Sequence, residues 1–184
     1  MTETATSPFD DTDEALQQLL SLRPEQAVQL FSTLGSPVAC AVAGEYAGRI
    51  GNYLRRDWDE MMAESGLGRW LGKGYRGGTA GDTSGEGYNI YSRDGQITRS
   101  MRFSWHIGPS TIDSRPALMM HYSAFDNWAG KRDLVDELRI WRDDTLLGVF
   151  HTDRPVPRFT AAGDGSRSAI GFFVLKRSGD AAPR

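Results

Sequence analysis

Short segments of alternating apolar and polar residues, separated by glycine-rich or charged turns, dominate the chain from residue 45 onward. Residues that alternate with period two predict strands, and connections without helices predict antiparallel neighbours. Eight strands from one chain favour closure into a barrel, which removes exposed edges and can enclose one small ligand. The predicted strands are Glu45 to Leu54, Trp70 to Arg76, Gly87 to Ser92, Ile97 to Ile107, Ala117 to Phe125, Val135 to Arg142, Thr145 to Thr152 and Ala169 to Lys176.

Helical spacing is confined to the part of the chain that precedes these strands or separates the first two. Residues 12–35 carry apolar positions with helical periodicity, interrupted by Pro24 and ended by Gly35 and Pro37. A third short helix is predicted from Asp57 to Ala63. We therefore expect one barrel domain over residues 12–177 with a helical cap at 12–35, and disordered tails at 1–11 and 178–184.

Size and charge limit the class of protein. The 184 residues suffice for one domain, and 21 Lys and Arg against 24 Asp and Glu argue against nucleic-acid binding. No apolar run is long enough to span a membrane, and residues 1–13 lack the features of a signal peptide. The single cysteine, Cys40, excludes an internal disulfide framework. These features predict a cytoplasmic protein without a membrane partner; the oligomeric state stays open, with a homodimer among the alternatives.

One hairpin can be aligned by arithmetic. If Asp143 and Asp144 form a two-residue turn, paired residue numbers sum to 287. Asp136 then lies opposite His151, on the same face as two apolar pairs, and that apolar face is the expected interior. The pairs are Ile140 with Leu147 and Leu138 with Val149.

The preceding hairpin has a longer loop. One alignment pairs Trp105 with Leu118, Phe103 with Met120 and Met101 with Tyr122 on an aromatic face, which we assign to the interior. His106 and His121 then point outward. Tyr122 becomes a polar group inside an apolar cavity, able to form a hydrogen bond with a ligand.

These alignments predict a hydrophobic wall around a cavity of at least about 300 Å³, the lower range for ligand pockets. A bound hydrophobic ligand should quench tryptophan fluorescence and stabilise the fold. The predicted ligand-binding residues are Tyr88, Met101, Phe103, Trp105, Met120, Leu138, Val149 and Phe172, with Phe173 as the alternative to Phe172.

Several glycine-anchored segments resemble a bacterial family named for its G-x-W-x-G motif. Residues 44–49, Gly-Glu-Tyr-Ala-Gly-Arg, are similar to that motif with Tyr46 in place of tryptophan, and residues 70–75, Trp-Leu-Gly-Lys-Gly-Tyr, resemble the W-x-G-K-x-F segment that follows it. Residues 135–139 and 143–149 resemble the closing hairpin of the family, and residues 171–177 its final strand. The resemblance implies a calycin-like, lipocalin-type barrel with a small-molecule cavity, and it carries over no catalytic residues.

The polar residues suggest three alternative chemistries. A pair of Asp136 and His151 could transfer protons near neutral pH, with Tyr122 donating a hydrogen bond to a developing enolate or alkoxide; the alternative is a structural ion pair at the barrel mouth. A metal site is disfavoured because the three histidines show no ligand spacing. Haem held by one axial histidine remains an alternative.

Two classes of function follow from a barrel with polar groups in its lumen. The first is a cofactor-independent cyclase, isomerase or dehydratase of secondary metabolism, acting on a hydrophobic substrate through Asp136, His151 and Tyr122. The second is a carrier that sequesters a lipid-like ligand. An acid, a base or a tyrosine aimed at the ligand favours the enzyme, because a carrier needs only shape and an apolar wall.

Overall fold

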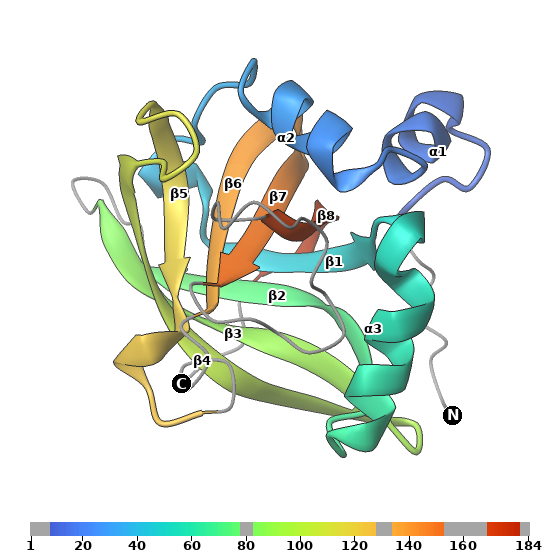
Figure 1. The fold of residues 1–184 in the computed structure, drawn as a ribbon. Coiled ribbons are helices and arrows are strands. Elements are labelled where there is room, and N and C mark those ends of the chain that lie inside the picture. The colour runs from blue at the N-terminus through green and yellow to red at the C-terminus, as the bar shows by residue number, and fades with distance from the viewer. Residues whose placement is uncertain (1–7, 78–82, 128–133, 153–168, 181–184) are drawn as a thin grey trace.

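The chain folds into a closed antiparallel barrel in which each strand pairs with its neighbours in sequence and the last strand pairs with the first (Figure 1). This computed structural model describes residues 8–77, 83–127, 134–152 and 169–180. The barrel predicted from the alternating segments is confirmed. The strands are β1 (Gly44–Ile50), β2 (Arg69–Gly77), β3 (Ser84–Arg93), β4 (Gln96–Pro109), β5 (Pro116–His121), β6 (Leu134–Arg142), β7 (Thr145–Thr152) and β8 (Ala169–Gly179).

Two helices, α1 (Glu14–Leu20) and α2 (Pro24–Phe31), precede the barrel. The carboxylate of Asp13 caps α1 by accepting the Leu16 N–H, and Pro24 begins α2. Both helices lie along the outer wall of the barrel (Figure 1), where α2 packs against β7 and β8. None of the helices in the described ranges is long and apolar enough to cross a membrane.

A third helix, α3 (Asn52–Glu64), joins β1 to β2 and lies next to both strands (Figure 1). It begins five residues before the predicted helix, and the predicted first strand was correspondingly too long. The strand ends at Ile50 because Gly51 turns the chain, and the Gly51 N–H bonds to the Phe172 carbonyl of β8. The described residues also form two short 3₁₀ turns, η1 (Ala39–Ala41) and η2 (Tyr122–Ala124).

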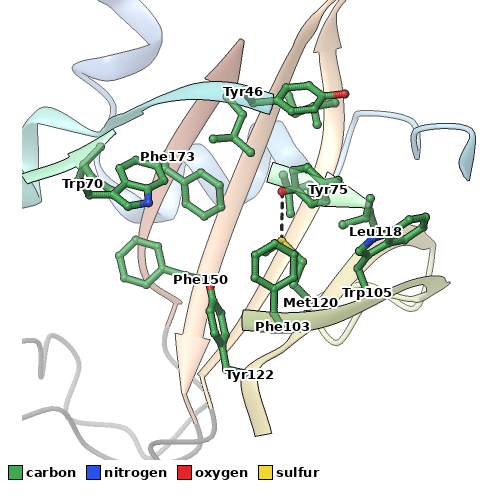
Figure 2. Close-up of a cluster of buried hydrophobic side chains, with 14 of the residues drawn as sticks. Tyr46, Trp70, Tyr75, Phe103, Trp105, Leu118, Met120, Tyr122, Phe150 and Phe173 are labelled. Atoms are coloured by element: carbon green, nitrogen blue, oxygen red, sulfur yellow. Dashed lines mark hydrogen bonds between the residues drawn. The ribbon is translucent and has the colours of Figure 1, made fainter. Parts of the chain in front are cut away.

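The barrel wall separates two hydrophobic clusters. The lumen contains a largely aromatic cluster (Figure 2), and the outer face of β5, β7 and β8 contacts α1 and α2. Strands β7 and β8 are therefore buried on both faces, which explains their nearly continuous apolar sequences. The lumen cluster includes Tyr46, Trp70, Tyr75, Phe103, Trp105, Leu118, Met120, Leu138, Phe150 and Phe173. The outer cluster includes Leu16, Phe31, Ala117, Met119, Leu147, Val149, Phe172 and Val174.

The predicted alignment of β6 with β7 is wrong by one residue along most of its length. Arg142 pairs with Thr145 as predicted, but a register shift lies between Ile140 and Arg142. From there on Leu138 pairs with Gly148, and Asp136 pairs with Phe150. A bulge of this kind moves every later side chain of one strand to the opposite face relative to its predicted partners.

In β4 and β5 the predicted alignment is displaced by two residues, so that Trp105 pairs with Met120 instead of Leu118. A shift of two preserves the faces, because side chains alternate with period two. Phe103, Trp105 and Met120 consequently lie in the lumen, as the sequence predicted.

Both predicted tails contribute described structure. Phe9 is buried in the outer cluster, with the Arg49 guanidinium 4.7 Å from its ring centre. Strand β8 continues to Gly179, two residues beyond the predicted end of the domain, because Gly179 pairs with Glu45 of β1.

Candidate functional site

Four polar side chains from four parts of the barrel meet inside the lumen. Lys73 comes from β2, Asn89 from β3, Tyr122 from η2 and Asp136 from β6, and each is at most 4% exposed. The Lys73 ammonium lies 2.9 Å from Asp136 Oδ2 and donates to Tyr122 Oη at 2.6 Å and Asn89 Oδ1 at 2.8 Å. Tyr122 also donates to Asp136 Oδ2, at 3.0 Å. We call these four residues the lumen polar cluster.

Lys73 points inward because of an irregularity in β2. The alignment with β3 shifts between Trp70 and Gly72, so Trp70 and Lys73 both enter the lumen although they lie three residues apart. Gly72 makes this possible: its φ is +148°, and a Cβ there would lie 1.9 Å from the Tyr46 carbonyl oxygen. No other residue type fits so close to the neighbouring strand.

Asn89 connects the cluster to the lumen wall. Its side-chain oxygen accepts the Trp70 indole N–H at 3.0 Å in addition to the Lys73 ammonium. Its amide group donates to Tyr122 Oη and to the Met101 carbonyl, both at 3.1 Å. The buried polar groups are thus joined in one network, as low-dielectric surroundings require.

Burial lowers the pKa of Lys73, and the adjacent Asp136 carboxylate acts in the opposite direction. Burial also raises the pKa of Tyr122 well above its ordinary value, and the negative charge of Asp136 adds to this. Tyr122 is therefore a neutral hydrogen-bond donor at physiological pH.

Aromatic rings surround the ammonium. Its Nζ lies 5.1–5.6 Å from the ring centres of Trp70, Phe103, Tyr122 and Phe173. Contacts at this distance stabilise a cation through the ring quadrupole. They offset part of the cost of removing Lys73 from water.

The cluster lines a cavity that continues to α3. Its free volume is about 20 Å³, which is room for one water molecule. The predicted cavity of about 300 Å³ is therefore wrong for this conformation, because Trp58 and Met62 of α3 and the lumen aromatics occupy the space. The other residues around the cavity are Ile50, Trp70, Tyr91, Met101, Leu134, Phe150 and Phe173.

The predicted pair of Asp136 and His151 does not form. Asp136 points into the lumen, whereas His151 pairs with Val135 and lies on the outer face. Its actual carboxylate partner is Glu137, whose Oε1 lies 2.9 Å from His151 Nε2. The one-residue error in the alignment of β6 and β7 accounts for the exchange of Asp136 for Glu137.

The remaining predicted residues divide between the two faces. Tyr122, Phe103, Trp105, Met120 and Leu138 lie in the lumen, and Met101 borders its cavity. Val149 and Phe172 instead face α1 and α2 in the outer cluster, and Phe173 is the lumen residue.

Tyr88 also lies outside the lumen, contrary to prediction. It covers Gly74 and donates to Glu45 Oε1 at 2.7 Å on the outer face. Asn89 and Tyr91 take the inward positions of β3 instead.

A second polar cluster lies on the outer wall around Glu137. Its carboxylate is fully buried and accepts hydrogen bonds from Ser110 Oγ, Thr111 N and Thr111 Oγ1 in addition to its contact with His151. Thr111 Oγ1 and Glu137 Oε1 both contact His151 Nε2. A catalytic triad needs the acid and the nucleophile on different ring nitrogens, so this geometry indicates a structural role.

His106 and His121 point outward, a direction that the long loop had left open in the sequence, and their rings stack with centres 5.3 Å apart. Among the described residues, no group of three or more His, Cys, Asp or Glu side chains is arranged to hold a metal ion.

Comparison with known proteins supports the fold. A crystal structure of a protein from Thermomonospora curvata aligns with a TM-score of 0.53, covering 92% of this chain and 99% of the other at 17% sequence identity. At this identity the likeness extends to the fold alone. Neither a protein-family model nor a curated protein matches the chain.

Sequence reasoning missed Lys73 and Asn89. A lysine in a strand is expected to face solvent, and Asn89 lies between tyrosines that compete for the inward position. One signal was available. Lys73 and Tyr75 are two residues apart in a strand and so share a face, which places Lys73 in the lumen once Tyr75 is assigned there.

Proposed function

We propose that this barrel binds a small hydrophobic molecule in its lumen and acts on it by cofactor-independent proton transfer, as an isomerase, dehydratase or cyclase. The observation that carries the proposal is the lumen polar cluster, in which Lys73, Tyr122 and Asp136 border the internal cavity. A carboxylate, a tyrosine and an ammonium in contact within an apolar lumen are the groups that general acid–base chemistry uses.

Entry of a ligand requires α3 to move, because the free space holds only one water molecule. The helix is suited to this. No side chain caps its N-terminus, its first turn has no acidic residue and its last turn has no basic residue. Of its thirteen residues, Leu54 and Met62 are buried. Displacing Trp58 and Met62 would extend the cavity to the surface.

In the proposed reaction Asp136 is the base. It accepts a proton from a carbon next to a ligand carbonyl, and the electrons of the C–H bond move onto the carbonyl oxygen to form an enolate. Once Asp136 holds the proton, it no longer attracts the Lys73 ammonium and the Tyr122 O–H as a carboxylate, and both groups turn their hydrogen bonds to the enolate oxygen. Returning the proton from Asp136 to another carbon completes an isomerisation without an external reagent.

The resemblance to the G-x-W-x-G family supports a lipocalin-type barrel, and the two motif segments contact each other. Gly48 of the first segment leaves room for Trp70 of the second: a Cβ at position 48 would lie 2.3 Å from the indole ring. Tyr46, which replaces the tryptophan of the motif, packs edge-on against Tyr75 at 5.4 Å. Membership of that family, a role in secondary metabolism and a cytoplasmic location are parts of the proposal.

A non-catalytic carrier is the second candidate, and one observation favours it. The Lys73 ammonium has three N–H donors, and it has three oxygen partners within the protein. A network that is complete without a ligand is also what a purely structural cluster would show.

A generic proton-abstraction probe separates the two candidates. Nitrobenzisoxazole loses its carbon-bound proton to a base while its N–O bond breaks, and the product is a coloured cyanonitrophenolate. We expect the wild-type protein to accelerate this reaction with saturation, and Asp136→Asn to lower the rate by about 10²-fold, the usual scale for losing a general base.

Glu137→Gln is the matched control, because it removes the neighbouring carboxylate of β6 on the outer face. Its rate should stay near that of the wild type at a temperature where both are folded. Saturable binding of the probe with equal turnover in wild type and Asp136→Asn would favour the carrier.

A further inference from the structure

We infer that the lumen selects an uncharged ligand with a hydrogen-bond acceptor, and that the indole N–H of Trp58 recognises this acceptor. The inference rests on the proposed function, since it specifies the ligand of the same cavity. It follows from two features of the described part of the cavity wall: a balanced pair of charges, and a buried N–H donor without a partner there.

The charges of the cavity wall cancel. Among the described residues around the cavity, Lys73 and Asp136 are the ionisable pair with opposite charges, and their atoms lie 2.9 Å apart. The nearby tyrosines remain neutral, because burial raises the pKa of Tyr91 and Tyr122 well above the ordinary value. An ionic ligand would bring an uncompensated charge into a low-dielectric space, which is strongly unfavourable.

The unused donor is on α3. Trp58 Nε1 is buried and has no hydrogen-bond partner among the described residues, and Trp58 lines the cavity. The indole of Trp70 provides a contrast within the same wall, because its N–H is bound to Asn89. A buried N–H without an acceptor is unfavourable, so an acceptor atom in the cavity would be stabilised there.

The position of Trp58 connects recognition to closure of the lumen. Its ring packs against Phe150 at 5.4 Å and Trp70 at 6.2 Å between ring centres. The indole therefore reaches the cavity only while α3 lies against the barrel. Because the closed cavity holds one water molecule, a larger ligand displaces α3 in part. A ligand that accepts the Trp58 N–H keeps the indole turned toward the lumen, and its apolar part contacts the aromatic wall.

Three naphthalene derivatives, substituted at the same ring carbon, test the inference by equilibrium dialysis against the full chain. Acetylnaphthalene is uncharged and has an acceptor, ethylnaphthalene is uncharged and has none, and naphthoate is an anion at pH 7. We expect acetylnaphthalene to bind about 10-fold more tightly than ethylnaphthalene, which is the contribution of one hydrogen bond. Naphthoate should bind more weakly than acetylnaphthalene.

Trp58→Phe removes the donor and keeps an aromatic ring. In this variant the affinity ratio of acetylnaphthalene to ethylnaphthalene should fall to about one, while ethylnaphthalene affinity changes little. Trp141→Phe is the control, since Trp141 packs with the outer cluster. It should retain the wild-type ratio. The comparison of the three compounds on the wild-type protein does not depend on whether either variant folds.

The possible results separate this inference from the proposed function. Tightest binding of naphthoate, or a wild-type ratio near one, would overturn the inference and leave a ligand-binding lumen in place. An unchanged ratio in folded Trp58→Phe would show that another group recognises the acceptor, and so contradict the role of Trp58. Absence of binding by all three compounds would count against both the inference and the proposed function.

Discussion

Lys73 is the residue on which the interior of this barrel most depends. It is 3% exposed, and its ammonium joins β2, β3, β6 and η2 through Asn89, Asp136 and Tyr122. A buried ion pair adds little net stability compared with apolar residues of the same shape. Removing one partner is different, because the other charge is then left uncompensated in the lumen.

Lys73→Met should therefore lower the free energy of unfolding by about 3–5 kcal/mol, measured by urea denaturation. Adding Asp136→Asn to this variant should recover part of the loss, since the uncompensated carboxylate is then absent. Lys176→Met on the outer face of β8 is the control and should change stability by less than about 0.5 kcal/mol. Equal losses for the two lysine variants would contradict the buried-pair argument.

Single-residue predictions from sequence succeeded where hydrophobicity determined the face of a strand. Phe103, Trp105 and Tyr122 were assigned to the lumen because aromatic side chains alternate there with polar ones. The same rule placed Tyr88 in the lumen, although it is buried on the outer face. It also led us to expect Lys73 on the surface. Burial of a lysine depends on partners supplied by distant strands, and local periodicity contains no information about them.

At the scale of elements, bulges determined what could be predicted. Eight strands and their antiparallel order follow from alternation and turn residues, and the structure agrees. A bulge adds one unpaired residue to a strand, and the residue types there do not differ from those of a regular strand. The register shift between Ile140 and Arg142 therefore could not be predicted from the sequence. This one shift explains why the sequence predicted Asp136, and not Glu137, as the partner of His151.

Helix α3 should be the least protected of the longer elements. Hydrogen exchange of its amides is expected to be at least ~10-fold faster than that of β6 to β8, because few of its side chains are buried and no side chain caps its N-terminus. Mass spectrometry of the exchanging protein measures this directly. Protection in α3 equal to that of the strands would rule out its role as the entrance.

Gly171→Ala should loosen α3 selectively. A Cβ at position 171 would lie 2.0 Å from Leu54 Cδ1, so the main apolar contact of the first helical turn must shift. We expect faster exchange in α3, with exchange in β2 to β6 unchanged. Gly95→Ala is a control for the glycine substitution, because nothing lies within 4 Å of a Cβ there, although its φ of +77° adds local strain to the turn.

Acid should weaken the contact that joins the loop between β4 and β5 to α2. Arg139 is fully buried and bonds both to Asp113, at 2.6 and 2.7 Å, and to the Phe31 carbonyl at the end of α2. The hydrogen bond with Arg139 lowers the pKa of Asp113 from 3.8 to about 2.

The lowered pKa of Asp113 determines how stability changes with pH. The stabilising effect of the Asp113 carboxylate is complete above pH 3.8 and is lost as the pH falls toward about 2. Asp113→Asn should be less stable than the wild type near pH 6, and the difference between the two should shrink over that interval. Unfolding curves at several pH values test this; a difference that does not depend on pH would contradict it.

In the whole molecule, the residues that attach the helices and the residues of the proposed site lie on opposite faces of the barrel wall. The outer cluster attaches α1 and α2 to the barrel, whereas the lumen holds the polar cluster and the cavity. Substitutions in the outer cluster should thus affect folding without changing what the lumen binds.

Phe31→Ala tests this division. Phe31 is fully buried between α2 and the barrel, with the Arg139 guanidinium 4.4 Å from its ring centre. Its removal should lower the free energy of unfolding by about 3–5 kcal/mol, as for other buried phenylalanines. Affinity for acetylnaphthalene should change less than about 2-fold at temperatures where the variant remains folded, since additivity holds for separate sites.

The pairing of β1 with β8 closes the barrel, so it determines when the barrel can close during synthesis of the chain. β1 is among the first parts of the barrel to leave the ribosome, and its partner on the closing side is the last strand to be made. Until β8 arrives, the backbone groups of β1 on that side form an open sheet edge, which is prone to pair with other chains. The growing chain therefore passes through an unclosed intermediate, and this is the stage at which a chaperone would have most to protect.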